Sequence, residues 1–92
     1  MKDCRAEGPL TLATVPGLYS QWIAAAGPSG MAVNLAAVTD VDSSSLALLI
    51  ATRRAVERAG GQFEVRAVPG AMRTLAQLYG VDFIVDNLKP HD

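Results

Sequence analysis

The chain has few of the residues from which catalytic and metal sites are built. Cys4 is its only cysteine and His91 its only histidine, so neither an internal disulfide nor a thiolate metal site is available. The serines have no histidine to serve as a base, apart from His91, which we interpret as part of a solvated C-terminal tail. We therefore expect no cofactor, no metal and no catalysis by this chain.

Aromatic side chains and net charge are also scarce. Aromatic residues make up 5% of the sequence and the formal net charge is −1, which argues against a nucleic-acid groove and against general attraction to anionic membranes. The first residues mix charges and lead into no apolar run of transmembrane length, so neither a signal peptide nor a membrane span is expected. These absences predict a cytoplasmic protein that reaches a membrane only through a partner.

Length and hydrophobic content set the size of the fold. Half of the 92 residues are hydrophobic, enough to fill one small core but not two. We assign residues 10–88 to a single domain and interpret residues 1–9 as a flexible leader, because they are short, polar and mixed in charge.

A strand, an acidic turn and a helix follow one another in the middle of the chain. The apolar run 31–38 contains no glycine or proline and favours a strand buried on both faces. Residues 44–59 contain no helix breaker and end at Gly60-Gly61, which suits a helix exit. Asp42 or Ser43 precedes the first turn and is a natural cap. We favour this turn-and-cap interpretation over a cation site at Asp40 and Asp42, which would need more oxygen ligands.

The remaining segments alternate between strand and helix patterns. Helical spacing places Trp22 on the apolar face of one helix and Tyr79 on that of another, so we expect both in the core. This alternation predicts an α/β fold, an open sheet with helices mainly on one side. In order, the segments are an edge strand at 10–14, a helix at 15–26 capped by Thr14, a strand at 62–68, a helix at 71–79, and a last strand or packed turn at 81–85.

Four short motifs stand out within residues 31–85, namely Val41-Asp42-Ser43, Leu46-Ala47-Leu48-Leu49, Ala59-Gly60-Gly61, and Thr74 to Val81. Together they resemble the STAS domain family of small bacterial α/β modules. The resemblance is strongest to the MlaB-type STAS subunit of the Mla lipid-transport system and implies an open, mixed β-sheet. Ser45 departs from the pattern, because the family usually has glycine there.

The resemblance implies a non-catalytic cytoplasmic subunit of a bacterial phospholipid ABC transporter. Such a subunit binds and stabilises the ATPase, and through it the permease, and supports outer-membrane lipid asymmetry. It inserts into no membrane and takes no small-molecule substrate. In that branch Ser43 is a hydroxyl important to partner engagement. The alternative is an anti-sigma-factor antagonist, the other branch that the loop resembles, in which Ser44 occupies the position of the phosphorylated serine.

Projection of residues 44–59 as a helix adds a candidate binding face. The apolar majority, which includes Leu48, Leu49, Thr52 and Val56, lies on one broad side suited to docking on the sheet. Leu46 and Ile50 fall on the other side beside arginines, a composition enriched in protein interfaces. The predicted partner-binding residues, with the loop included, are Asp42, Ser43, Ser44, Ser45, Leu46, Ile50, Arg53 and Arg54.

Overall fold

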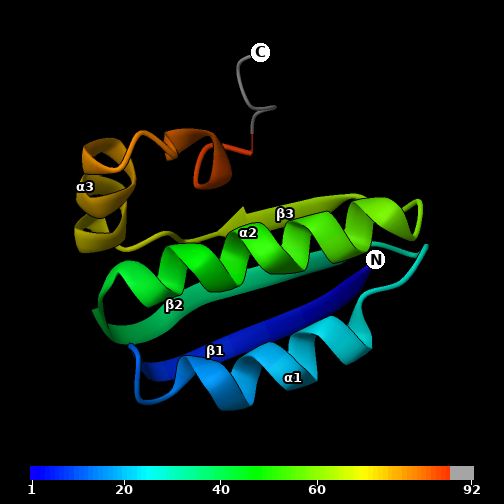
Figure 1. Cartoon of the computed structure of the whole chain (residues 1–92), viewed down its shortest axis with the longest axis horizontal. Coiled ribbons are helices and arrows are strands. Elements are labelled where there is room, and N and C mark those ends of the chain that lie inside the picture. Colours follow the sequence, from blue (N-terminus) through cyan, green and yellow to red (C-terminus); the bar gives the residue numbers. More distant parts are fainter. Residues whose placement is uncertain (88–92) are drawn as a thin grey trace.

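The computed structural model describes residues 1–87 and shows strands alternating with helices (Figure 1). The predicted tail residue His91 and the predicted domain end at residue 88 lie outside this part of the chain. The elements are β1 (Lys2–Leu10), α1 (Val15–Ala25), β2 (Met31–Val41), α2 (Ser43–Arg58), β3 (Phe63–Arg66), α3 (Gly70–Leu78) and the short 3₁₀ helix η1 (Asp82–Ile84).

The three strands form one parallel sheet in the order β1-β2-β3. Helices α1 and α2 make the two crossovers and lie on the same side of the sheet, while α3 lies beyond the end of β3 (Figure 1). The predicted α/β fold with helices mainly on one side is therefore confirmed. The mixed sheet is not found within residues 1–87, because both crossovers return the chain in the same direction.

Strand β2 is covered on one face only over most of its length. Met31, Val33 and Leu35 are buried beneath the helices, whereas Asn34 and Ala36 on the opposite face are exposed. The prediction of a strand buried on both faces holds only at the start of β2, where Ala32 is 2% exposed, and is wrong from Asn34 on, since the helices form one layer. Charged side chains occupy the open face instead. There one guanidinium nitrogen of Arg66 in β3 lies 2.7 Å from a carboxylate oxygen of Glu64, and another lies 3.8 Å from a carboxylate oxygen of Asp3 in β1.

The first strand replaces the predicted flexible leader. Residues 2–10 pair with β2 from the register Lys2–Met31 to Leu10–Val41. Ala6 and Leu10 are buried against the helices and Cys4 is half-buried, while the charged residues between them are exposed. Buried and exposed residues therefore alternate with the period of two that is typical of a strand. This pattern was missed in the sequence because the segment is short, polar and mixed in charge. The predicted edge strand at 10–14 is wrong except at Leu10, which ends β1, because residues 11–14 form a turn.

Helix α1 follows the sequence prediction closely. It begins at Val15 with Pro16 in its first turn, and Trp22 is buried in the core as expected. Thr14 precedes the helix, but its hydroxyl does not cap it. That hydroxyl donates to the Pro9 carbonyl (2.8 Å) and accepts a hydrogen bond from the Thr11 amide (3.0 Å), so Thr14 ties the turn together instead.

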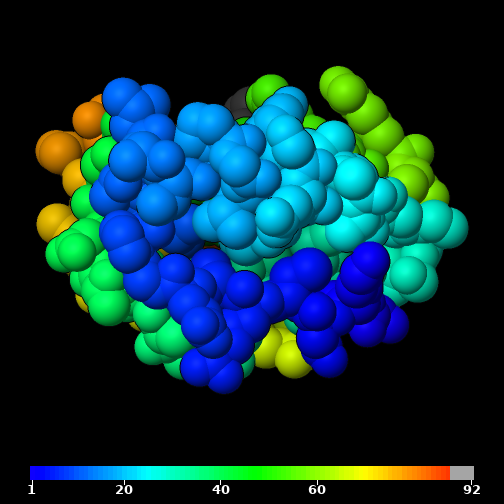
Figure 2. Space-filling model, turned by 90° about the horizontal axis from the view of Figure 1, so that it is seen from below, coloured from blue at the N-terminus to red at the C-terminus, as the bar shows by residue number. Residues whose placement is uncertain are grey.

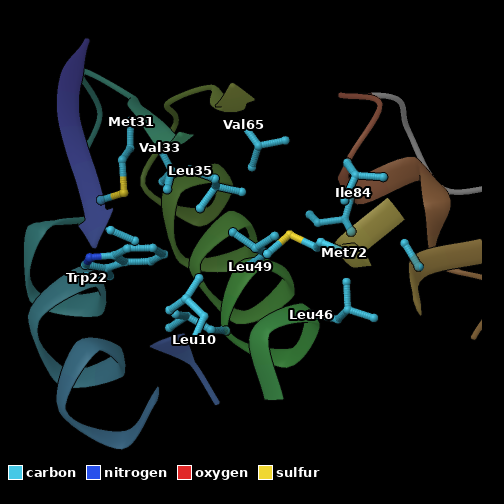
Figure 3. Close-up of a cluster of buried hydrophobic side chains, with 14 of the residues drawn as sticks. Leu10, Trp22, Met31, Val33, Leu35, Leu46, Leu49, Val65, Met72 and Ile84 are labelled. Atoms are coloured by element: carbon cyan, nitrogen blue, oxygen red, sulfur yellow. The ribbon is translucent and has the colours of Figure 1, made fainter. Parts of the chain in front are cut away.

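The core lies between the sheet and the helices and extends towards α3 and η1. Met72 of α3 and Ile84 of η1 meet Leu49 of α2 there (Figure 3). The segment 81–85 packs down as a helical turn rather than pairing as a strand. The largest fully buried apolar side chains are Leu10, Met31, Val33, Leu35, Leu48, Leu49, Val56, Met72 and Ile84.

The end of α3 departs from the prediction. Leu78 is 76% exposed and Tyr79, which we expected in the core, is 58% exposed. Helix α3 buries only a narrow face through Met72 and Ala76, because it packs at the end of the sheet rather than across it. Tyr79 lies at the C-cap, before Gly80 turns the chain away with a φ of +70°.

Candidate partner-binding site

Asp42 organises the loop between β2 and α2. One carboxylate oxygen accepts the Ser44 amide (2.8 Å), which caps α2 as predicted. The other accepts the Leu12 amide from the turn after β1 (2.9 Å). The backbone of Asp42 also donates to the Leu10 carbonyl (3.3 Å). Asp42 therefore joins two neighbouring loops, and its side chain stabilises the fold whether or not a partner is bound.

These bonds predict how the stability of the domain depends on pH. The Leu12 amide, with help from Ser44, holds the pKa of the Asp42 carboxyl below its usual value. A group whose pKa is lower in the folded state stabilises the fold above its unfolded pKa, and that stabilisation is lost as the pH falls through the folded pKa. We expect Asp42→Asn to lower the melting temperature at neutral pH, and the difference from the parent to shrink in acid.

Thermal unfolding of the parent and of Asp42→Asn across the acidic range measures this contribution. Asp40→Asn is the matched control, because Asp40 is exposed in the same region of the chain. A constant difference between Asp42→Asn and the parent at every pH would show that the carboxylate charge does not matter.

The three serines occupy three different environments. Ser43 is exposed, Ser44 is half-buried beside Asp42, and Ser45 is fully buried. The Ser45 hydroxyl donates to the Asp42 carbonyl (2.7 Å) and so has a local partner. Ser45 therefore cannot flank a contact surface as predicted, since its side chain points into the fold. Ser43 presents the accessible hydroxyl of the cluster.

Leu46 is a core residue rather than a surface anchor. It is only 3% exposed and belongs to the buried cluster, and Ile50 is half-buried against the same cluster. Helix α3 and η1 both contact α2 and form the C-terminal part of this core (Figure 3). The prediction that Leu46 lies on an exposed face is wrong, because α2 is covered on two sides.

The two predicted arginines, Arg53 and Arg54, also differ in their exposure to solvent. The Arg53 guanidinium lies over the Phe83 ring, 5.6 Å from its centroid, and pairs with Glu57 at 3.4 Å. Its side chain is only 11% exposed, so Arg53 holds the η1 region against α2. Arg54 is exposed, as predicted.

The exposed stripe of α2 lies next to the predicted one. Ser43, Ala47, Arg54 and Arg58 are exposed at helical spacing, with half-buried Ile50 between them. We call these five residues the outer face of α2. Ala47 was missed, because it is small and carries no charge. The helical projection places it between Ser43 and Arg54, but only the position of α3 decides which stripe remains open.

Other kinds of site find little support. Residues 1–87 contain no group of three or more His, Cys, Asp and Glu side chains placed to hold a metal ion. Over the same residues, every helix is too short or too polar to cross a membrane. The features that stand out are the exposed serine loop and the outer face of α2, both suited to contact with another macromolecule.

Comparison with known proteins agrees with this description. A family model described as "Mlab, STAS domain" matches residues 4–86. No curated protein matches the chain. Among solved structures, the anti-sigma factor antagonist SpoIIAA in its unphosphorylated form has the same fold, with a TM-score of 0.65 and 21% sequence identity. The match covers 80% of this chain and 70% of SpoIIAA. Because the family model spans nearly the whole chain, this protein belongs to the MlaB-type STAS domain family.

Proposed function

We propose that this protein is the non-catalytic STAS subunit of a bacterial phospholipid ABC transporter of the Mla type. In this role it binds the ATPase subunit in the cytoplasm, stabilises it and is linked through it to the permease. The transporter supports outer-membrane lipid asymmetry. The observation that carries the proposal is the outer face of α2, which begins at the exposed Ser43 and which no other element of residues 1–87 covers.

The composition of this face supports a protein partner. Ser43 and Ala47 are small and permit close approach, while Arg54 and Arg58 supply positive charge at the other end of the helix. A partner surface that fits has an apolar or hydroxyl-rich area beside acidic side chains. The family description names Mlab, and the resemblance of the loop and helix motifs to MlaB-type subunits supports the ATPase of a lipid transporter as that partner.

The proposal is tested by replacing Ala47 with glutamate. The larger charged side chain would stand in the centre of the outer face and would oppose docking, with an expected loss of affinity of about tenfold or more. Pull-down of the ATPase from the native bacterium, followed by titration of the purified pair, measures the effect. Ala24→Glu makes the same change at an exposed position of α1 and should leave binding unchanged.

An ATPase recovered equally well by the Ala47→Glu and Ala24→Glu variants would contradict the proposed surface. Failure of the parent protein to recover any ABC ATPase would contradict the proposed function itself.

An anti-sigma-factor antagonist is the second candidate, supported by the fold shared with SpoIIAA and by the position of Ser44. Phosphate on Ser44 would place nearly two negative charges beside the Asp42 carboxylate. It would also compete with that carboxylate for the backbone amides of Leu12 and Ser44. Mass spectrometry of the recovered complexes separates the candidates. An anti-sigma factor with kinase activity and phosphate on Ser44 would favour this switch, and an ATPase with unmodified serines the transporter.

A further inference from the structure

The two edges of the sheet differ in how they are closed. At the β3 edge, the Asn87 side chain accepts from the Val65 amide (2.8 Å) and donates to the Val65 carbonyl (3.1 Å), so it occupies the groups that an added strand would use. Strand β1 pairs with β2 alone. Its outer side lies along the molecular surface beside α1 (Figure 2). Within residues 1–87, the β1 edge is therefore the one open to strand addition.

The backbone hydrogen bonds show which groups of β1 face outward. The Lys2 amide donates inward to the Gly30 carbonyl, the residue before its register partner Met31. Because the direction alternates along the regular stretch Lys2 to Arg5, Cys4 also faces β2, and Asp3 and Arg5 present their amides and carbonyls outward. The register with β2 shifts between Arg5 and Glu7. The open part of the edge ends near Pro9, which has no amide hydrogen and whose carbonyl already accepts from Thr14.

Self-pairing of these outward groups is restricted by charge. In an antiparallel pair of two β1 strands, the odd-numbered residues face each other. Asp3 opposite Asp3, or Arg5 opposite Arg5, would place like charges together. Arg5 opposite Glu7 would place Asp3 opposite Pro9, where the donor is missing. The register with Asp3 opposite Arg5 brings no like charges together and places no proline in the pair. By symmetry it forms two Asp3–Arg5 pairs, one at each end.

We propose that β1 pairs antiparallel with β1 of a second copy, with Asp3 of each chain opposite Arg5 of the other. This register forms four backbone hydrogen bonds and two opposite-charge pairs, and it makes one six-stranded sheet. It places Cys4 opposite Cys4 of the second copy in a pair without mutual hydrogen bonds, where the two Cα atoms are about 4.5 Å apart. Cysteines at that separation are close enough for a disulfide, so Cys4 reports the register.

The contact is small and its affinity is correspondingly modest. A contact made of four backbone hydrogen bonds and exposed ion pairs buries much less surface than a stable protein interface does. Arg5 must also exchange its exposed pair with Glu7 (3.3 Å) for the pair with Asp3 of the second copy. We therefore expect association that depends on protein concentration and that oxidation of Cys4 traps.

Oxidative crosslinking of the full chain tests the pairing. The reaction is run at mildly alkaline pH, since burial raises the pKa of the Cys4 thiol. A disulfide-linked dimer is expected, together with concentration-dependent dimerisation in sedimentation before oxidation. Arg5→Glu would face Asp3 of the second copy with like charge at both positions, so we expect the crosslinking rate to fall about tenfold or more.

The double variant Asp3→Lys/Arg5→Glu reverses both charges and should restore crosslinking to near the parent rate. Circular dichroism of each variant verifies that the fold is intact. A chain that stays monomeric at all concentrations would overturn the proposal. So would a dimer that Arg5→Glu leaves unchanged, or one that forms no Cys4 disulfide, because each points to another surface. These variants leave the outer face of α2 intact, so the result is independent of ATPase binding.

Discussion

Replacing Leu46 with alanine is expected to lower the free energy of unfolding by about 2–5 kcal/mol, the cost of removing a buried leucine side chain. Leu46 is 3% exposed and lies in the part of the core that α3 and η1 complete (Figure 3). The cavity would weaken packing between α2 and these later elements. Urea unfolding followed by circular dichroism measures the difference.

Leu78→Ala is the matched control for this effect. It removes the same atoms from a side chain that is 76% exposed, so the expected change is within about 0.5 kcal/mol. Similar losses for the two variants would mean that α3 does not cover Leu46 in solution. Leu46 would then return to the set of surface residues available to a partner.

Replacing Gly61 with alanine is expected to cost about 3 kcal/mol, at the upper end of the range for overpacking. A Cβ atom at Gly61 would lie 2.6 Å from the Gly27 carbonyl oxygen and 2.8 Å from the Gly30 Cα. Both are backbone atoms of the loop between α1 and β2, which cannot rotate away as a side chain can. Thermal and urea unfolding of the variant measure the cost.

The adjacent Gly60 separates crowding from backbone conformation. Gly60 has a φ of +90° and open space around its Cβ position, so Gly60→Ala should cost only the conformational penalty of about 1–2 kcal/mol. If Gly60→Ala destabilised the domain as much as Gly61→Ala, the close approach of the two loops would not be the limiting contact.

Local patterns in the sequence were sufficient to predict most of the elements. The prediction of 44–59 for the central helix differs by one residue at each end from Ser43–Arg58, because Asp42 caps its start and Gly60 follows its end. Trp22 was placed correctly in the core by helical spacing alone. The first strand was missed, since its alternation of small apolar and charged residues contains no β-branched side chain to strengthen the signal.

The candidate site was predicted less completely than the fold. The acidic cap and the exposed Ser43 follow from local chemistry, because both depend on residues within one turn. The second bond of Asp42, to Leu12, joins residues thirty positions apart and has no sequence signature. The contact between Arg53 and Phe83 is likewise long-range, and it removes Arg53 from the freely exposed residues.

The sequence by itself determined the order of strands and helices, the central cap and the family motifs, because hydrophobic period, capping and turn chemistry act over a few neighbouring residues. Only the tertiary structure decided that Leu46 and Ser45 are buried, that Ala47 lies on the open side of α2, and that β1 is the open edge of the sheet within residues 1–87. The burial of Leu46 depends on where α3 and η1 pack against α2, and the difference between the two sheet edges depends on Asn87, which bonds to β3. The residues of a single helix or strand do not specify which distant element will cover it.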